Sequence, residues 1–449
     1  MDESEQLDQI IFDTIIPLPY RILFLIQLGH LLWYLIVYGC YKINNLNVLQ
    51  LINLSYSSHN YPQLGDNLEV GEEATVNEAD IQENDLLLKG IWSNFRIISV
   101  NTIISYIIFK SIQIIFVNEN DHDTLKLLYH LIPLITMMVI CYKIFHNDDR
   151  KSIGKLRIFT TMKRILTGNI NSSTMRTNDI LISDSLMSYS KVLNDIGIFI
   201  WHYFISDEMH YNEILEFLIL CLPSLIRIRQ CWNEFVLTGS RAHFLNLLKY
   251  VSGLSPIFIN FLIKFNIEQW GEDEGAEKDQ HLQFIKTLNM IWYFASFVNS
   301  TYSFIWDVKM DWGFGCFDGI AAKFTASPSP TISTPTPTST RNMAKSLLFL
   351  RPDHQLIYSN KIIYYLAIVI DFILRYLWVF KIVIIHDAEN LPVITKIGLF
   401  LFGYDAFSFG YCLIEVLEIL RRFMWCFFKL ESDWFKLKPQ PIELTKFNQ

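Results

Sequence analysis

The sequence predicts an all-α fold, a polytopic transmembrane helix bundle of about nine spans, and three observations lead to this prediction. Of the 449 residues, 51% are apolar and only 18% are charged, whereas soluble domains carry about a quarter charged residues. The chain also holds 34 Phe and 21 Tyr, a surplus that suits surfaces facing lipid. Several stretches of roughly 20 residues carry almost no charge, and this is the length that crosses a bilayer as a helix.

Nine segments are predicted to span the membrane. Four of them contain at most one charged residue, although the third is rather short. In chain order these are Ile22–Tyr41, Ile97–Val117, Leu127–Tyr142 and Thr287–Trp306. Five further segments are apolar but carry charges inside, so hydropathy alone predicts them less clearly. These are Ile180–Ser206, Tyr211–Arg229, Phe244–Phe265, Ile362–Ile385 and Ile397–Leu430.

The segments between the spans complete the expected domain organisation. The start, Met1–Asp8, is acidic where a signal peptide needs a basic region, so the first span is expected to stay in the mature protein. A Ser/Thr/Pro-rich tract, Ser327–Thr340, cannot form a packed core. The expected divisions are an acidic tail at 1–21, transmembrane helices at 22–146 with a polar loop at 42–95, a basic interfacial linker at 147–179, a transmembrane core at 180–434 with the Ser/Thr/Pro-rich loop at 325–345, and a tail at 435–449.

The charges beside the spans predict the orientation, because cytosolic loops near helix ends are rich in Lys and Arg. The segment Arg150–Arg176 is basic, as is a predicted loop that holds Arg227, Arg229 and Arg241, so both are expected in the cytosol. The acidic segment Glu268–Asp279 is expected on the opposite side. The C-terminal tail then falls in the cytosol, and nine spans place the N-terminus in a lumen or outside.

Composition and motifs disfavour several functional classes. The seven cysteines are scattered without a C-x-x-C pair, so neither a metal site nor a disulfide framework is expected. The chain has no P-loop, no H-E-x-x-H and no G-x-S-x-G motif, so we expect no catalytic residues and no cofactor. The formal net charge is −8 and no basic domain stands out, which argues against a nucleic-acid partner.

Charged residues inside the predicted spans are the most informative feature, because each costs about 2.5–3.5 kcal/mol to insert. Asp184, Lys191 and Asp195 are spaced i, i+7 and i+11, which places them on one face of a continuous helix. Asp371 and Arg375 are spaced i, i+4 and can form an ion pair. The remaining charged positions inside spans include Lys249, Asp307, Glu415, Glu418, Arg421 and Arg422, of which Glu418 can reach either arginine.

Two interpretations of these charges stay open for each pair. The buried charges could be interhelical ion pairs that only fix packing. They could also line a polar pathway for anions, since arginine binds phosphate oxygens with two parallel hydrogen bonds. Five charged spans in one chain favour the pathway.

The second half of the chain resembles the EXS family. The stretches that carry the resemblance are RIRQCWNEFVLTGSRAHFLNLLKY at 227–250, YSFIWDVKMDWG at 302–313, IIYYLAIVIDFILRYLW at 362–378 and LEILRRFMWCFFKLESDW at 417–434. The likeness covers roughly 150–434, with the Ser/Thr/Pro-rich tract as an insertion. Only about 20 residues precede the first span, too few for the SPX domain of the longer members. The chain therefore looks like the short, ER-retention-defective type.

The resemblance implies a set of site residues, carried over by motif position. The last six helices would form the core through which phosphate passes, and Trp378 would act as a gate. The implied phosphate-pathway residues are Asp184, Arg227, Lys249, Tyr250, Asp307, Arg375, Arg421 and Arg422, with ion-pair support from Lys191, Asp195, Asp371 and Glu418. Two departures from the family pattern stand out: Met187 occupies the place of an Asn, and Leu248 precedes Lys249 where the family has a glycine.

The resemblance also implies a function, a location and partners. The expected protein is a multi-pass phosphate exporter of the Golgi membrane with a cytosolic C-terminus. It would return lumenal phosphate released by glycosylation to the cytosol, and so support glycosylation and the retention of ER lumenal proteins and Golgi glycosyltransferases. The expected partners are inorganic phosphate and the lipid bilayer, and a homodimer stays open. The alternative is a sorting adaptor that recruits the cytosolic machinery for glycosyltransferase recycling and transports nothing.

Overall fold

A computed structural model describes most of the chain, and every element in the described part is helical. The described residues are 12–52, 78–116, 123–145, 153–171, 176–205, 211–270, 276–315, 350–351, 355–386 and 408–437. Several predicted features lie partly or wholly outside them: most of the acidic N-terminal tail, residues 53–77 of the polar loop, the whole loop at 325–345, residues 397–407 of the last predicted span, and residues 438–449 of the C-terminal tail.

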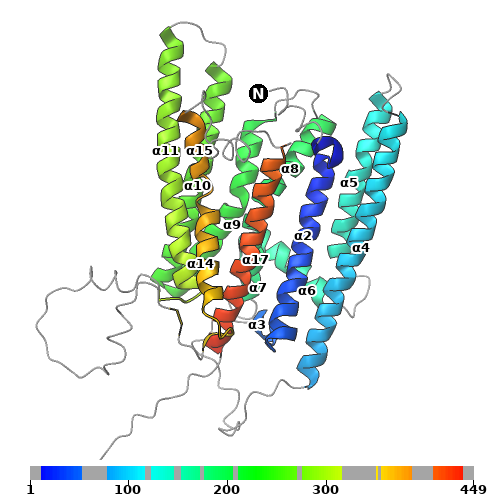
Figure 1. The fold of residues 1–449 in the computed structure, drawn as a ribbon, viewed down its shortest axis with the longest axis vertical. Helices are drawn as coiled ribbons and strands as arrows, with labels where there is room; N and C mark the ends of the chain where they lie inside the picture. Colours follow the sequence, from blue (N-terminus) through cyan, green and yellow to red (C-terminus); the bar gives the residue numbers. More distant parts are fainter. Residues whose placement is uncertain are drawn as a thin grey trace, which may run out of the picture.

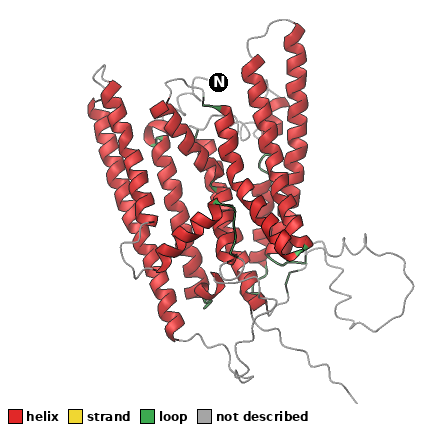
Figure 2. Ribbon diagram, turned by 180° about the vertical axis from the view of Figure 1, so that it is seen from behind, coloured by secondary structure: helices red, strands yellow, loops and turns green. Residues whose placement is uncertain are grey.

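The helices form one elongated bundle, with most of their axes running along its length (Figure 1), and the view from behind shows the same arrangement (Figure 2). The long helices are α2 (Leu18–Tyr38), α4 (Glu78–Phe116), α5 (Asp123–Phe145), α9 (Glu213–Thr238), α10 (Arg241–Trp270), α11 (Ala276–Trp306) and α17 (Phe409–Leu437). The shorter ones are α3 (Val48–Ile52), α6 (Ile153–Leu166), α7 (Arg176–Ser188), α8 (Ser190–Ile200), α14 (Ile362–Arg375) and α15 (Val379–His386). Short π-helical turns follow α2, α8 and α11.

The predicted all-helical membrane bundle is confirmed, while the count of nine spans stays a prediction. Each predicted span contains at least one helix. Within the described residues, four helical stretches are long and apolar enough to cross a membrane. These are Leu18–Ile43, Ile81–Ile115, Arg241–Ile267 and Ile362–Ile382, and a shorter apolar helix covers Tyr129–Ile144.

Two loop predictions were wrong. Residues 42–95 are not all loop, because α4 begins at Glu78 and extends the second span by a polar helical stretch. Hydropathy detects only the apolar part of such a helix and therefore places its start too late. Arg227 and Arg229 also lie within α9 rather than in a loop. The charge of Arg227 suggests a loop because its buried partner, Asp184, is distant in sequence.

The hairpin between α9 and α10 shows how local sequence sets helix ends. The Asn212 side chain accepts a hydrogen bond from the Leu215 amide at 3.0 Å and caps the start of α9. Gly239 ends the helix at φ 64°, a left-handed conformation that favours glycine. Two residues later α10 begins, so the two helices pack side by side in antiparallel fashion. This hairpin brings Arg227 and Lys249 to the same part of the bundle.

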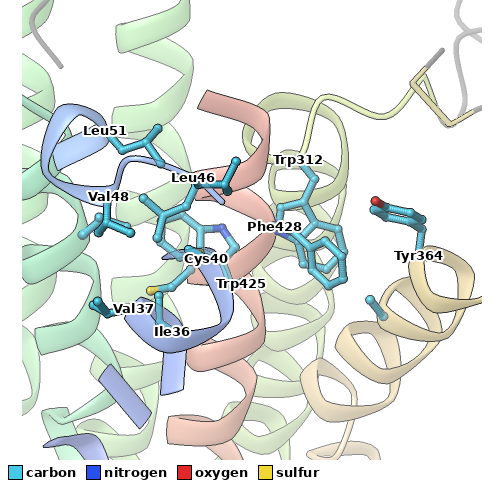
Figure 3. Packing of buried hydrophobic residues seen from close by; sticks show 14 of the residues in the cluster. Ile36, Val37, Cys40, Leu46, Val48, Leu51, Trp312, Tyr364, Trp425 and Phe428 are labelled. Atoms are coloured by element: carbon cyan, nitrogen blue, oxygen red, sulfur yellow. The ribbon is translucent and has the colours of Figure 1, made fainter. Parts of the chain in front are cut away.

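A cluster of buried apolar side chains joins α2, α17, α14 and the segment after α11 at one end of the bundle (Figure 3). Trp312 and Tyr364 both pack against Phe428, with ring centroids 5.3 and 5.5 Å apart. Trp425 is fully buried, and its indole N–H donates to Asp311 at 3.2 Å. Since α14, α17 and the end of α11 carry the predicted site residues, this packing fixes their relative depth in the bundle.

Close approach between α2 and the junction of α7 and α8 depends on Gly29. A side chain added there would collide with the Tyr189 hydroxyl, which donates to the Leu25 carbonyl at 3.0 Å. Overpacking of this kind costs about 1–3 kcal/mol. We therefore expect Gly29→Ala to lower the thermal unfolding temperature of the detergent-purified protein. Gly90→Ala on α4 is the matched control, since nothing lies within 4 Å of an added Cβ. Equal stability of the two variants would contradict this packing.

Candidate functional site

Most of the sequence-predicted pathway residues meet inside the bundle, between α7, α9, α10, α14, α17 and the end of α11. Five cations and four carboxylates gather there among the described residues. They are Arg227, Lys249, Arg375, Arg421 and Arg422 with Asp184, Asp307, Asp371 and Glu418. The set carries one more positive than negative charge, which is the balance expected of a site that receives an anion. We call these nine residues the central cluster.

Asp307 lies at the centre of this cluster. Its carboxylate contacts Arg375 directly, and it lies 3.7 Å from Lys249 and 3.7 Å from the Arg421 guanidinium. The side chain is 1% exposed, so its charge is stabilised by these three cations rather than by water. Asp307 also opens the π-helical turn Asp307–Asp311 at the end of α11, a distortion that is frequent at functional sites.

The charged pairs predicted within single helices do form. Arg375 donates to Asp371 at 3.0 Å, as the i, i+4 spacing predicts. Arg421 binds both oxygens of Glu418, at 2.6 and 2.9 Å, which selects the i+3 partner. Arg421 also contacts Asp371 at 3.2 Å and thereby links α17 to α14. Asp371 and Glu418 thus hold the side chains of Arg375 and Arg421 in place, which fixes the direction of the N–H groups that these carboxylates do not bind.

On the side of α7 and α9, the central cluster consists of Asp184 and Arg227, with Tyr250 packed beside them. Arg227 lies 2.8 Å from Asp184, and the Tyr250 hydroxyl donates to the same carboxylate at 2.7 Å. The Lys249 ammonium lies 4.6 Å from the centre of the Tyr250 ring, so Lys249 connects this group to Asp307. Met187, where the family pattern has an Asn, packs beside Tyr250 and accepts a weak hydrogen bond from Ser224 at 3.7 Å.

Arg422 differs from the other arginines of the central cluster. Among the residues that the structure describes, no carboxylate lies within ion-pairing distance of its guanidinium. Its Nε donates to the Ser188 hydroxyl at 3.2 Å, and the guanidinium stacks over Trp425 with 4.7 Å to the ring centre. Arg422 lines a small cavity of about 30 Å³ between α2, α7 and α17, with Gly29 and Ser188 also in its wall. An anion that enters this cavity meets a guanidinium with free donors.

Trp378 lies at the junction of α14 and α15, beside the central cluster. Its indole N–H donates to Ser300 at 2.9 Å, and Ser300 in turn donates to the Arg375 carbonyl at 3.0 Å. Trp292 packs against the Trp378 ring at 6.0 Å in an edge-to-face arrangement. The ring is thus connected to the backbone of a site arginine, while its role as a gate stays a prediction.

One prediction about the fourth span was wrong. Asp184, Lys191 and Asp195 do not share one continuous helical face, because the helix is interrupted at Tyr189 between α7 and α8. Asp184 joins the central cluster, whereas Asp195 pairs at 2.5 Å with Arg21 and lies beside Glu415. Helical periodicity cannot detect this change, since it assumes an unbroken helix.

Sequence reasoning missed Arg21 altogether. Its side chain is 3% exposed and reaches Asp195 and Glu415, the latter at 3.6 Å. Arg21 directly precedes the charge-free stretch of the first span, and a basic residue in that place resembles an ordinary anchor at the membrane interface. The available signal was the pair of unpartnered acids, Asp195 and Glu415, in two other predicted spans.

Comparison with known proteins gives a consistent result. The sequence pattern of the EXS family matches residues 16–435. Protein ERD1 of Kluyveromyces lactis is 27% identical over 339 residues, which are 72% of this chain and 74% of that protein. Protein ERD1 of Saccharomyces cerevisiae is 24% identical over 71% of this chain and 70% of its own length. Solute carrier family 53 member 1 of Mus musculus is 28% identical over 57% of this chain and 32% of its length.

Proposed function

The chain belongs to the EXS family, since the family pattern matches nearly its whole length, and from this premise we propose that it exports inorganic phosphate across the Golgi membrane. Phosphate released in the lumen by glycosylation would return to the cytosol through the central cluster. The route supports glycosylation and, through it, the retention of ER lumenal proteins and Golgi glycosyltransferases. Resemblance to the short members of the family supports the Golgi location.

The observation that carries this proposal is the state of Arg422 within the central cluster. Four cations there have carboxylate partners, and Arg422 has a hydroxyl and an aromatic ring instead. A partly buried guanidinium with no carboxylate of the described residues within ion-pairing distance attracts an anion, and its planar fork matches two phosphate oxygens. The carboxylates hold the other cations in fixed directions around the same place. Packing alone does not require the extra positive charge of the central cluster, because ion pairs that only hold helices together can be neutral overall.

The site also explains how a phosphate could be released again. The Arg421 and Arg375 guanidinium groups are already bound to carboxylates, so a phosphate would share rather than capture their donors. Moderate binding at several neighbouring cations suits conduction, which requires that the ion can leave as well as enter. In this scheme Arg422 is the first strong contact, and Arg421, Arg375 and Lys249 offer further positive charge.

Phosphate efflux from proteoliposomes tests the proposal. The purified protein is reconstituted with radiolabelled phosphate inside the vesicles, beside an Arg421→Ala/Arg422→Ala variant. We expect saturable efflux that the variant loses. The matched control is Arg229→Ala/Arg241→Ala, two exposed arginines on α9 and α10, which is expected to keep efflux. Folded wild-type protein without efflux would overturn the proposal and favour the sorting adaptor, whose activity would not depend on the buried arginines.

A further inference from the structure

A second group of buried charges lies closer to the end of the bundle where α2 and α17 begin (Figure 1). It consists of Arg21 on α2, Lys191 and Asp195 on α8, and Glu415 on α17, and we call it the α2–α8–α17 cluster. Arg21 lies 2.5 Å from Asp195 and 3.6 Å from Glu415. The Tyr411 ring lies near both cations, 5.6 Å from the Arg21 guanidinium and 5.0 Å from the Lys191 ammonium. Phosphate transport through the central cluster makes no use of this group.

The two carboxyl groups of this cluster have oxygens that lack donors. Both side chains are 0% exposed. Within the described residues, no hydrogen-bond donor reaches Asp195 Oδ1 or either Glu415 oxygen. The two carboxyl groups nevertheless converge on the same Arg21 guanidinium, at 2.5 and 3.6 Å, and interact with each other there. Two ionised carboxylates beside one guanidinium would repel each other, and both would leave acceptors unsatisfied in an apolar interior. A proton between them converts the contact into a hydrogen bond and removes one buried negative charge.

We propose that Asp195 and Glu415 hold one exchangeable proton between them, and that this proton is transported together with phosphate. The inference rests on the proposed phosphate export and deepens it. The proton binds to one carboxylate oxygen and is later released to water, so no other chemical group is consumed. Interacting carboxyl pairs titrate as a unit, which makes the pair rather than either residue the proton site.

The geometry of α17 connects the proton site to the phosphate site. Glu415, Glu418 and Arg422 are spaced i, i+3 and i+7, so they share one face, and Glu415 and Arg422 are separated by about 10 Å of helical rise. Ser188 donates to Glu418 at 3.3 Å and accepts from Arg422 at 3.2 Å, which ties both to the end of α7. At about 10 Å and an effective dielectric constant near 20, removing one negative charge strengthens anion binding roughly tenfold. By linkage, bound phosphate strengthens proton binding equally.

Other charged and titratable groups surround Asp195 and Glu415 and contribute to the net charge around them. With both carboxylates ionised, Arg21 and Lys191 neutralise the α2–α8–α17 cluster, and an added proton makes it positive. The groups that interact with its members are Asp13 before α2, Lys381 on α15, and Tyr411, Cys412 and Glu418 on α17, while Glu216 on α9 interacts with Tyr411. The acids among them hold the added positive charge inside the bundle.

Simultaneous measurement of phosphate and proton movement tests the inference. Proteoliposomes hold radiolabelled phosphate and a trapped pH-sensitive dye, and valinomycin with equal potassium removes any membrane potential. For the wild type we expect efflux to rise roughly tenfold as the inside is acidified, with protons leaving alongside phosphate. Glu415→Gln keeps the shape of the side chain, and we expect it to retain phosphate efflux but lose most of the pH dependence. Asp85→Asn, at a partly exposed acid that pairs with Lys42 outside both clusters, is expected to behave as wild type.

The outcomes separate the two proposals. Absence of phosphate efflux in folded wild-type protein would overturn the proposed function itself. Wild-type efflux whose proton movement and pH dependence are unchanged in Glu415→Gln would overturn only the proton site. Asp195→Asn provides an independent second variant if Glu415→Gln does not fold, because it keeps an acceptor for Arg21. Loss of pH dependence in either folded variant supports the inference.

Discussion

Replacing Arg422 with Gln is expected to reduce phosphate affinity by about 30- to 150-fold while leaving the protein folded. The guanidinium has no carboxylate partner among the described residues, so its removal leaves no buried acid uncompensated. Arg422 can offer two hydrogen bonds to one phosphate and glutamine keeps one donor, so about 2–3 kcal/mol is lost, within the range of one hydrogen bond to a charged group. The stacking on Trp425 that is lost contributes little by comparison. Efflux measured against phosphate concentration in proteoliposomes gives the apparent affinity.

Two companion variants make this prediction specific. Arg422→Lys keeps the charge but loses the planar fork, so an intermediate affinity is expected. Arg229→Gln removes an exposed arginine from α9 and should transport like the wild type. If Arg422→Gln retained the wild-type dependence on phosphate concentration, Arg422 would not be the anion contact and the cavity beside it would have another role.

Replacing Asp307 with Asn is expected to destabilise the protein by about 3–5 kcal/mol. Asp307 is buried and contacts Arg375, with Lys249 and Arg421 close by. Removing one partner of a buried ion pair leaves the other charges uncompensated, and this costs far more than an exposed pair contributes. The measurement is the thermal unfolding temperature of the purified protein in detergent. A variant as stable as the wild type would show that water reaches these cations.

A double variant identifies the cause of this loss. Lys249→Met removes one of the cations that Asp307 neutralises while preserving most of the side-chain volume. If the loss arises from uncompensated charge, Asp307→Asn/Lys249→Met should be more stable than the sum of the two single effects predicts. Additive effects would instead indicate that Asp307 and Lys249 act independently.

Some pairings were predictable from the sequence because they lie within one helix. Asp371 with Arg375 and Glu418 with Arg421 follow from spacing, and both pairs form. Helical geometry alone brings such side chains together, whatever the surrounding fold. The choice between Arg421 and Arg422 as the partner of Glu418 did not follow, because both spacings permit contact. Packing of α14 against α17 places Asp371 beside Arg421 and leaves Arg422 facing the cavity.

The interruption at Tyr189 shows the limit of periodicity. The spacing of Asp184 and Asp195 places them together on an ideal helix, yet each belongs to a different charge cluster. The Tyr189 hydroxyl binds the Leu25 carbonyl on α2, a contact between residues 164 positions apart. Such a contact is invisible to any local window of sequence, and so is the pairing of Arg21 with Asp195.

The class of the protein, the approximate helices and the residues that carry buried charge follow from the sequence alone. Apolar length, helical spacing and the cost of burying charge are properties of short segments, and they are visible without a fold. The folded structure alone shows which charges meet, which arginine has no carboxylate partner in the described part of the chain, and that two acids share a site near Arg21. These depend on the rotation and depth of each helix, and packing between distant segments sets both.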